Sequence, residues 1–286
     1  MATRIAILGA GGQLGSELVH LAGDDALPID RSQLDVVDPV AVAGVLDALA
    51  PTHVINATAY NRVDDAEAAP EAAFAVNAHA PLHIAGWCEA RDVPLLHVST
   101  DYVFGGDRAR RTPFIESDTP APVSVYGLSK LTGEHAVRLR TSRHFIVRTC
   151  GLYGRQATRS KGNFVQTILR LAAERDRLEI VDDQRCTPTP TAVLAPLLLR
   201  LIQTNEYGLY HATSGGDCSW FEFAREIVRL KGLVVDVVPT TSDKFVRPAR
   251  RPGYSVLCCD KLAATLGERP SHWRESLATF LEANLR

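Results

Sequence analysis

The sequence predicts an α/β fold: a doubly wound parallel sheet with a smaller α/β lobe in the second half of the chain. Over the first 150 residues, short apolar runs alternate with helix-like stretches, which is typical of βαβ units. A glycine-rich turn, Gly9–Gly15, directly follows the first apolar run. After about residue 150 the alternation loosens and prolines cluster, which indicates a differently built second region.

Each element follows from its pattern in chain order. Val-, Ile- and Leu-rich runs predict strands at 5–8, 27–29, 53–57, 95–98 and 145–147, and helical spacing predicts helices at 13–22, 40–50, 70–90 and 124–140. Further strands are expected at 178–181 and 209–212, and helices at 220–232 and 273–285. We therefore assign residues 1–150 to a dinucleotide-binding domain of Rossmann type, to which the chain returns around 178–204. Residues 151–177 and 205–286 would form mainly the substrate-binding lobe.

Composition excludes several classes of protein. The chain has 286 residues, 46% of them hydrophobic and 22% charged, with a net charge of −2. That balance gives no electrostatic footprint for nucleic acid or for an anionic membrane surface. No apolar run approaches the roughly 20 residues of a membrane span, no signal-peptide layout opens the chain, and the six cysteines form no Cys-x-x-Cys pair. We expect a cytoplasmic protein, and a homodimer stays open.

The glycine turn is a candidate nucleotide site. Gly9 would permit the tight turn, Gly12 would let the backbone approach a pyrophosphate, and Gly15 would let the helix pack against the sheet. Gln13 and Leu14 lie within the same turn. The phosphates would face the free N–H groups at the helix N-terminus. The alternative is a glycine-rich turn without a ligand, but the strand–turn–helix context favours a dinucleotide.

The second predicted strand ends at Asp30 and Arg31, about 20 residues after the turn. An acidic residue there suits the ribose hydroxyls of NAD, and a nearby arginine suits the 2′-phosphate of NADP. Because both are present, we expect NADPH with NADH tolerated. A surface salt pair is the alternative.

Two segments carry side chains suited to carbonyl chemistry. Thr100 ends an apolar strand, and Tyr126 and Lys130 are four residues apart on one face of a predicted helix. A lysine ammonium near a phenol lowers the pKa of that phenol, so Tyr126 would give and take a proton near neutral pH. A partly exposed tyrosine beside a solvated lysine is the alternative.

The chain resembles the extended short-chain dehydrogenases/reductases of the NAD-dependent epimerase/dehydratase superfamily, and within them the dTDP-4-dehydrorhamnose reductases. The resemblance rests on motifs spread over almost the whole length: Gly9–Gly15, Leu34–Pro39, Val54–Tyr60, Val63–Glu67, Ala75–Asn77, Ser99–Phe104, Tyr126–Lys130 with Gly133-Glu134, Arg148-Thr149, Asn163-Phe164, Asp183-Gln184, Pro188-Thr189, and Arg251-Pro252 with Ser255.

The resemblance implies an NADPH-dependent reductase of a nucleotide-linked 4-keto sugar, with dTDP-4-dehydrorhamnose as the first candidate. Tyr126 would protonate the C4 oxygen, Lys130 would bind the nicotinamide ribose, and Thr100 would hydrogen-bond the reacting oxygen. Arg251 would suit the diphosphate. The remaining positions it implies are Asp35, Val36, Ala57, Thr58 and Ala59 for the cofactor, and Asp101, Tyr102, Asn163 and Gln184 for the substrate.

Departures from the family pattern leave the sugar open. Cys150-Gly151 and Arg185-Cys186 stand where those reductases more often carry other residues, and the two cysteines are expected to be small buried side chains. Some members hold magnesium through glutamates. Glu17 is in a matching position but is expected to be solvated, and we assign no metal ligand. Two other functions remain: an NAD-retaining sugar epimerase or dehydratase, and a non-catalytic NADP-binding regulatory subunit.

Overall fold

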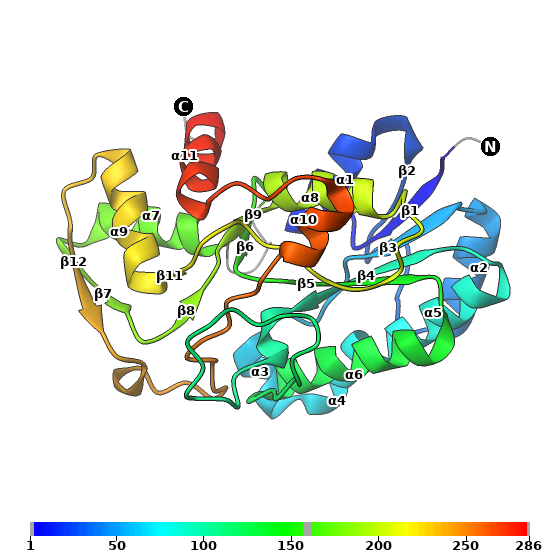
Figure 1. Cartoon of the computed structure of the whole chain (residues 1–286), viewed down its shortest axis with the longest axis horizontal. Coiled ribbons are helices and arrows are strands. Elements are labelled where there is room, and N and C mark those ends of the chain that lie inside the picture. Colours follow the sequence, from blue (N-terminus) through cyan, green and yellow to red (C-terminus); the bar gives the residue numbers. More distant parts are fainter. Residues whose placement is uncertain (1–2, 157–161, 285–286) are drawn as a thin grey trace.

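The structure is a computed structural model that describes residues 3–156 and 162–284 (Figure 1). Its central sheet has six parallel strands. The strand order is β10-β5-β4-β3-β1-β2. Because the chain runs from β1 outward to β2 and then returns to β3 on the other side of β1, the order reverses between β1 and β3. Ligands of such sheets bind outside the carboxyl ends of the strands at this reversal. The strand bounds are β1 Ile5–Leu8, β2 Ala26–Ile29, β3 His53–Asn56, β4 Leu95–Thr100, β5 His144–Thr149 and β10 Gly208–His211.

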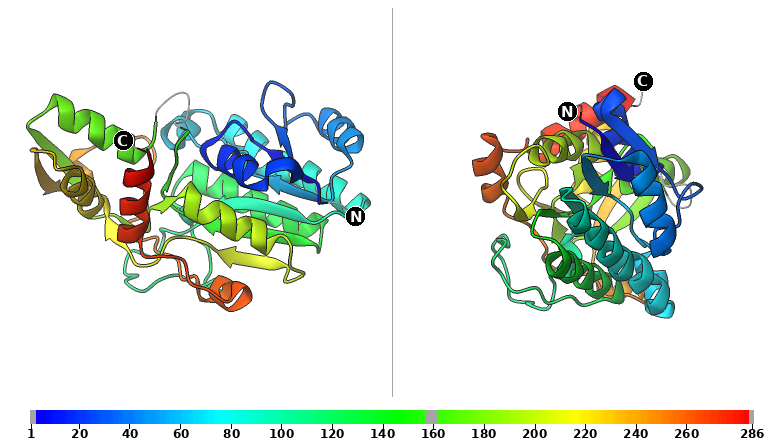
Figure 2. Two further views of the ribbon diagram at one scale, coloured as in Figure 1. Left: turned by 90° about the horizontal axis from the view of Figure 1, so that it is seen from above. Right: turned by 90° about the vertical axis from the view of Figure 1, so that its right-hand side faces the viewer.

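Both faces of the sheet are covered, which confirms the predicted doubly wound architecture. Successive strand side chains point to opposite faces. Ile5 and Ile7 pack in one core with α1 (Gln13–Ala22), α8 (Thr191–Leu201) and α10 (Asp260–Leu266). Ala6 and Leu8 pack in the other with α2 (Pro39–Leu49), α5 (Ala80–Ala90) and α6 (Val125–Arg140). The left view of Figure 2 looks onto the face that α1 and α8 cover.

The helix starts follow from local chemistry. The Asp38 carboxylate accepts hydrogen bonds from the backbone N–H groups of Val40 and Ala41, and Pro39 occupies the first position of α2. Ser124 caps α6 by accepting from the N–H of Gly127. The single helix predicted over 70–90 is wrong in detail, because it is divided into α4 (Pro70–Phe74), a π-helical segment (Ala75–His79) and α5. The short α3 (Val63–Ala68) precedes it.

A second region lies beside the sheet, on the left in Figure 1. Its core is aromatic, with Tyr153, Phe223, Trp273 and Phe280 packed together. Its helices are α7 (Phe164–Glu174), α9 (Trp220–Lys231) and α11 (Trp273–Asn284), and its two-stranded pairs are β7 (Arg177–Val181) with β12 (Asp236–Thr240), β8 (Arg185–Cys186) with β11 (Cys218–Ser219), and β6 (Leu152–Tyr153) with β9 (Thr189–Pro190).

The chain crosses between the two regions more than once. We expected a return to the sheet around 178–204. Within that range α8 covers the sheet, whereas β7 pairs with β12 outside it. The sixth strand, β10, lies beyond the range and pairs with β5. The division at residue 150 stays a proposal. Among the described residues, no helix is long and apolar enough to cross a membrane.

Candidate active site

The turn between β1 and α1 has the shape that a dinucleotide requires. Gly9 has φ +86°, a left-handed conformation that favours glycine. A Cβ on Gly15 would lie 2.1 Å from the carbonyl oxygen of Gly9, so a side chain there would force helix and turn apart. The N-cap residue of α1, Gly12, has no side chain to cap the helix. The first N–H groups of α1 can therefore donate hydrogen bonds to phosphate oxygens.

A hollow of about 450 Å³ opens beside this turn. The Asp30 carboxylate lines it and accepts hydrogen bonds from the Ser32 backbone N–H (2.8 Å) and hydroxyl (2.6 Å). Arg31 is exposed next to it. Both residues therefore lie beside the glycine turn, at the end of β2. The other lining residues are Ala10, Gly11, Ser16, Val19, Pro28, Ser32 and Gln33.

The remaining candidate cofactor residues fall into three kinds of place. Leu14 is only 6% exposed and packs in the core, so only its backbone could meet a ligand. Asp35 is exposed and accepts from the N–H of Val37, while the side chain of Val36 packs against the α2-side core. Ala57, Thr58 and Ala59 follow β3, where the Asn56 side chain accepts from both the N–H and the hydroxyl of Thr58.

Thr100, Tyr126 and Lys130 are brought together where β4 meets the first turns of α6. The Lys130 ammonium donates to the carbonyl oxygen of Val98 at 2.6 Å. Tyr102 packs edge-on against Tyr126, with ring centroids 5.6 Å apart. Thr100 is 7% exposed and hydrogen-bonds with the Tyr126 phenol. Three groups predicted from two separate segments of sequence thus share one site.

The electrostatics of this site differ from the expectation. Burial raises the pKa of Tyr126 to about 12, and the hydrogen bond with Thr100 only partly opposes that shift. Lys130 does not lower it, because its ammonium is directed at Val98. Burial in turn lowers the pKa of Lys130 to about 8. The expected lowering of the Tyr126 pKa is therefore wrong for this arrangement, in which the phenol holds its proton at neutral pH.

Asp101, expected to face the substrate, instead organises the floor of the site. It is 3% exposed. Its carboxylate accepts from Ser255 Oγ (2.5 Å), Cys150 Sγ (3.0 Å) and Thr100 Oγ1 (3.2 Å). Burial raises the pKa of this carboxyl, and those hydrogen bonds oppose the shift. Cys150 and Cys186 are buried, as expected.

Arg251, the expected diphosphate ligand, makes a two-pronged ion pair with Asp64 of α3. Its Nη1 and Nη2 lie 2.9 and 2.8 Å from the two carboxylate oxygens of Asp64, and Nη1 also donates to the carbonyl of Ala249. Burial lowers the pKa of Arg251, but the hydrogen bond with Asp64 and the nearby Tyr102 together raise it more, so the pKa lies above its ordinary value. Arg251 is therefore at the site, but its guanidinium is already paired.

Asn163, also expected to face the substrate, caps α7 and reaches the cofactor turn instead. Its side chain accepts from the N–H of Gln166, while its Nδ2 donates to Gln13 Oε1 at 3.0 Å. Gln13 Oε1 also accepts from the N–H of Gly154. Gln13 therefore joins the glycine turn to the second region. Gln184 is half-buried between β7 and β8.

Sequence reasoning assigned no role to a buried ion pair that lies behind the site. Glu134 on α6 and Arg148 on β5 are 0% and 1% exposed, with Nη2 and Oε2 2.7 Å apart. Asn77, in the π-helical segment, donates to Ser129 of α6 and bonds the backbone of Tyr60. Glu134 follows Lys130 by one helical turn, and this spacing was the signal available in the sequence.

Glu17 was expected to be solvated, but its side chain is buried, with 8% exposed. Over residues 3–156 and 162–284, no group of three His, Cys, Asp or Glu side chains is placed to hold a metal ion.

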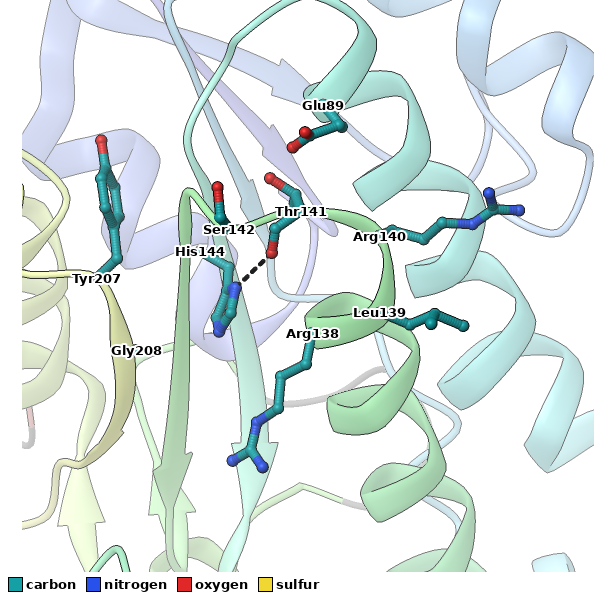
Figure 3. Close-up of a pocket in the computed structure, with 9 residues that line it drawn as sticks. All are labelled: Glu89, Arg138, Leu139, Arg140, Thr141, Ser142, His144, Tyr207 and Gly208. Atoms are coloured by element: carbon teal, nitrogen blue, oxygen red, sulfur yellow. Dashed lines mark hydrogen bonds between the residues drawn. The ribbon is translucent and has the colours of Figure 1, made fainter.

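A second hollow, of about 510 Å³, lies at the opposite edge of the sheet, past the end of α6. Figure 3 shows Arg138 and Arg140 directed away from each other, so they do not converge on a common anion. The His144 ring bonds the carbonyl of Thr141 there. The hollow has no connection to the chemistry of Tyr126.

Comparison with known proteins shows what the chain is similar to. Residues 3–286 match the family model described as RmlD substrate binding domain. A dTDP-4-dehydrorhamnose reductase of Mycobacterium tuberculosis is 41% identical, over 98% of this chain and 93% of the relative. A dTDP-4-keto-6-deoxy-D-glucose reductase of Streptomyces niveus is 36% identical, over 97% and 96%. The structure of a dTDP-4-dehydrorhamnose reductase of Bacillus anthracis in complex with NADP superposes with a TM-score of 0.93 at 36% identity, over 99% and 100%.

Proposed function

Because the chain belongs to the dTDP-4-dehydrorhamnose reductase family and is an oxidoreductase, we propose that it reduces the 4-keto group of a dTDP-linked sugar with NADPH. Dehydrorhamnose is the first candidate for the sugar. The family member from Streptomyces niveus is named for another 4-keto sugar, so the pocket decides between them.

The observation that carries the proposal is the meeting of Thr100, Tyr126 and Lys130. A bound nicotinamide would supply the hydride to C4. Tyr126 Oη, protonated at neutral pH, would give its proton to the C4 oxygen, so that ketone, hydride and proton make the alcohol. Thr100 would turn its hydroxyl proton from Asp101 to the same oxygen, where negative charge develops. Lys130 would bind the ribose of the nicotinamide.

The cofactor site fits a dinucleotide by its own geometry. The uncapped start of α1 offers N–H groups to the pyrophosphate, and the close approach of Gly15 to Gly9 leaves no room for a side chain there. Asp30 would accept from ribose hydroxyls, and Arg31 would pair with a 2′-phosphate. We propose NADPH as the preferred cofactor and NADH as a tolerated one.

The test follows NADPH absorbance with purified protein and dTDP-4-dehydrorhamnose. We expect oxidation that Tyr126→Phe reduces by at least about 10³-fold, because the proton donor is gone. NADPH binding, measured by fluorescence, should change less than about twofold. Tyr207→Phe, at the opposite edge of the sheet, is the matched control and should keep full activity.

Each other outcome points elsewhere. No oxidation despite NADPH binding contradicts dehydrorhamnose as substrate, and a panel of dTDP-4-keto sugars follows. Tightly retained NAD that interconverts sugars without net oxidation indicates an epimerase or dehydratase. Cofactor binding without turnover of any sugar indicates a regulatory subunit.

A further inference from the structure

The carboxyl end of β4 is joined to α6 residue by residue. The Val98 carbonyl accepts from Lys130 at 2.6 Å, and the Ser99 hydroxyl donates to Glu134 Oε1 at 2.6 Å. Thr100 completes the row through its contact with the phenol one turn before Lys130. Three consecutive strand residues thus bind three helix residues spaced by four. Displacing one of these contacts would shift the others.

Glu134 is the most constrained member of this row. It is fully buried. Besides Ser99, its carboxylate accepts from Arg148 Nε at 2.8 Å and Nη2 at 2.7 Å. A bidentate guanidinium fixes the plane of a carboxylate as well as its position. Because Arg148 is on β5, Glu134 holds α6 against two neighbouring strands at once.

Arg148 is itself held from the far side. Its Nη1 lies 3.4 Å from His211 Nε2 on β10, and its guanidinium lies 5.1 Å above the ring of Phe104. The other nitrogen of the His211 ring bonds the carbonyl of Phe114 at 3.1 Å. These contacts fix the orientation of the Arg148 guanidinium independently of its ion pair with Glu134.

The charges in this cluster depend on Glu134. Lys130 and Arg148 are both buried cations. Glu134 raises the pKa of Lys130 against the effect of burial. Burial and the nearby cation Lys130 lower the pKa of His97, and burial with Arg148 lowers that of His211 to about 3, so both rings are neutral. Titratable and charged groups on α6, on the elements packed against it and beside Arg148 include Tyr126 and Glu134 on α6, His97 on β4, Asp101 just beyond it, Arg148 on β5, His211 on β10 and Glu67 on α3.

We propose that Glu134 is a positioning residue of the active site, which fixes the end of β4 against α6 through Ser99 and Arg148 and keeps the Lys130 ammonium charged and in place. Its effect on turnover rests on the proposed reductase function. Its effect on Lys130 does not rest on that function. A measurement on Lys130 therefore tests the positioning role of Glu134 separately from the reductase function.

The decisive experiment observes Lys130 directly. The chain has five lysines, so ¹³C labelling at the ε-carbon gives few resonances, and Lys130→Met assigns the one of interest. In Glu134→Gln we expect the midpoint of the Lys130 titration to move about one pH unit lower, because an adjacent negative charge is removed. Glu89→Gln removes a carboxylate at the far edge of the sheet and should leave the midpoint unchanged.

Kinetics supply the second readout. With NADPH and the dTDP-sugar, Glu134→Gln should lower kcat by about tenfold and change the sugar KM by less than about twofold. In the pH profile of kcat for this variant, the alkaline limb should move in the same direction as the midpoint of the Lys130 titration. An unchanged Lys130 midpoint overturns the proposal, even if kcat falls, because the role would then be structural only.

Ser99→Ala keeps the proposal testable if Glu134→Gln does not fold. It removes one hydroxyl and leaves the ion pair, so we expect an unchanged Lys130 midpoint and a kcat lower by about threefold. An unchanged kcat in a folded Ser99→Ala protein would refute the link between β4 and Glu134.

Discussion

The two sides of the candidate site are built differently. On the chemistry side, β4 and α6 bring Thr100, Tyr126 and Lys130 together through buried contacts within adjacent elements. On the proposed substrate side, Arg251 lies in the loop before α10 and is paired with partly exposed Asp64. The first side is set by the packing of sheet and helix, and the second, as we propose, by an ion pair that a ligand would exchange. Reaction type should therefore tolerate little change, while the choice of sugar should be adjustable.

Thr100→Val tests the rigid side most strongly after the tyrosine. It keeps the volume but removes the hydroxyl that would stabilise charge on the C4 oxygen, so kcat should fall by about 10²-fold. NADPH binding should stay unchanged. A loss smaller than about threefold would mean that Thr100 only shapes the strand end. Thr132→Val, an outer substitution on α6, serves as the control in the same assay.

Arg251→Met tests the exchangeable side. If the guanidinium leaves Asp64 for the diphosphate, its loss should raise the KM of the sugar by about tenfold and change kcat less than about threefold. Arg250→Met is the matched control, because Arg250 is the adjacent arginine and its own side chain is exposed. A fall in kcat with an unchanged KM would place Arg251 with the chemistry and break the contrast between the two sides.

Arg31→Ala sharpens the comparison at the cofactor end. Loss of a cation beside the ribose should raise the KM for NADPH by about fivefold and leave that for NADH unchanged, since only NADPH carries the 2′-phosphate. Initial rates with each cofactor measure this. Equal changes for both cofactors would show that Arg31 acts on the loop and not on the phosphate.

Asp64→Asn should have the smallest effect, on stability. The hydrogen bond from Arg251 lowers the pKa of Asp64, so its contribution is present above the ordinary carboxyl range and is lost as the pH falls through the lowered value. The pair is partly exposed, and we expect less than about 1 kcal/mol at pH 7. Urea denaturation of both proteins should show a difference at pH 7 that is lost as the pH falls through the lowered pKa of Asp64.

Local pattern was enough to predict the glycine turn, the strands of the first half and the helix that carries Tyr126 and Lys130. It could not predict pairings over long separations, such as Arg251 with Asp64, 187 residues apart. Nor could periodicity predict the π-helical segment that places Asn77 against Ser129, because helical spacing looks the same on both sides of it. The spacing of Tyr126 and Lys130 gave their shared face, but the direction of the ammonium depends on the Val98 carbonyl, which belongs to another element.

The position of β10 has a consequence for how the chain can be made and cut. In the sheet, β5 lies between β4 and β10, yet β10 follows β5 in sequence only after a long stretch that includes part of the second region and α8. A fragment that ended at residue 150 would leave β5 as an open edge, with Phe145, Ile146 and Val147 in it. Such an apolar edge favours pairing with another chain. The nascent polypeptide faces the same exposure on the ribosome until β10 emerges, so the first half alone is a poor choice for expression.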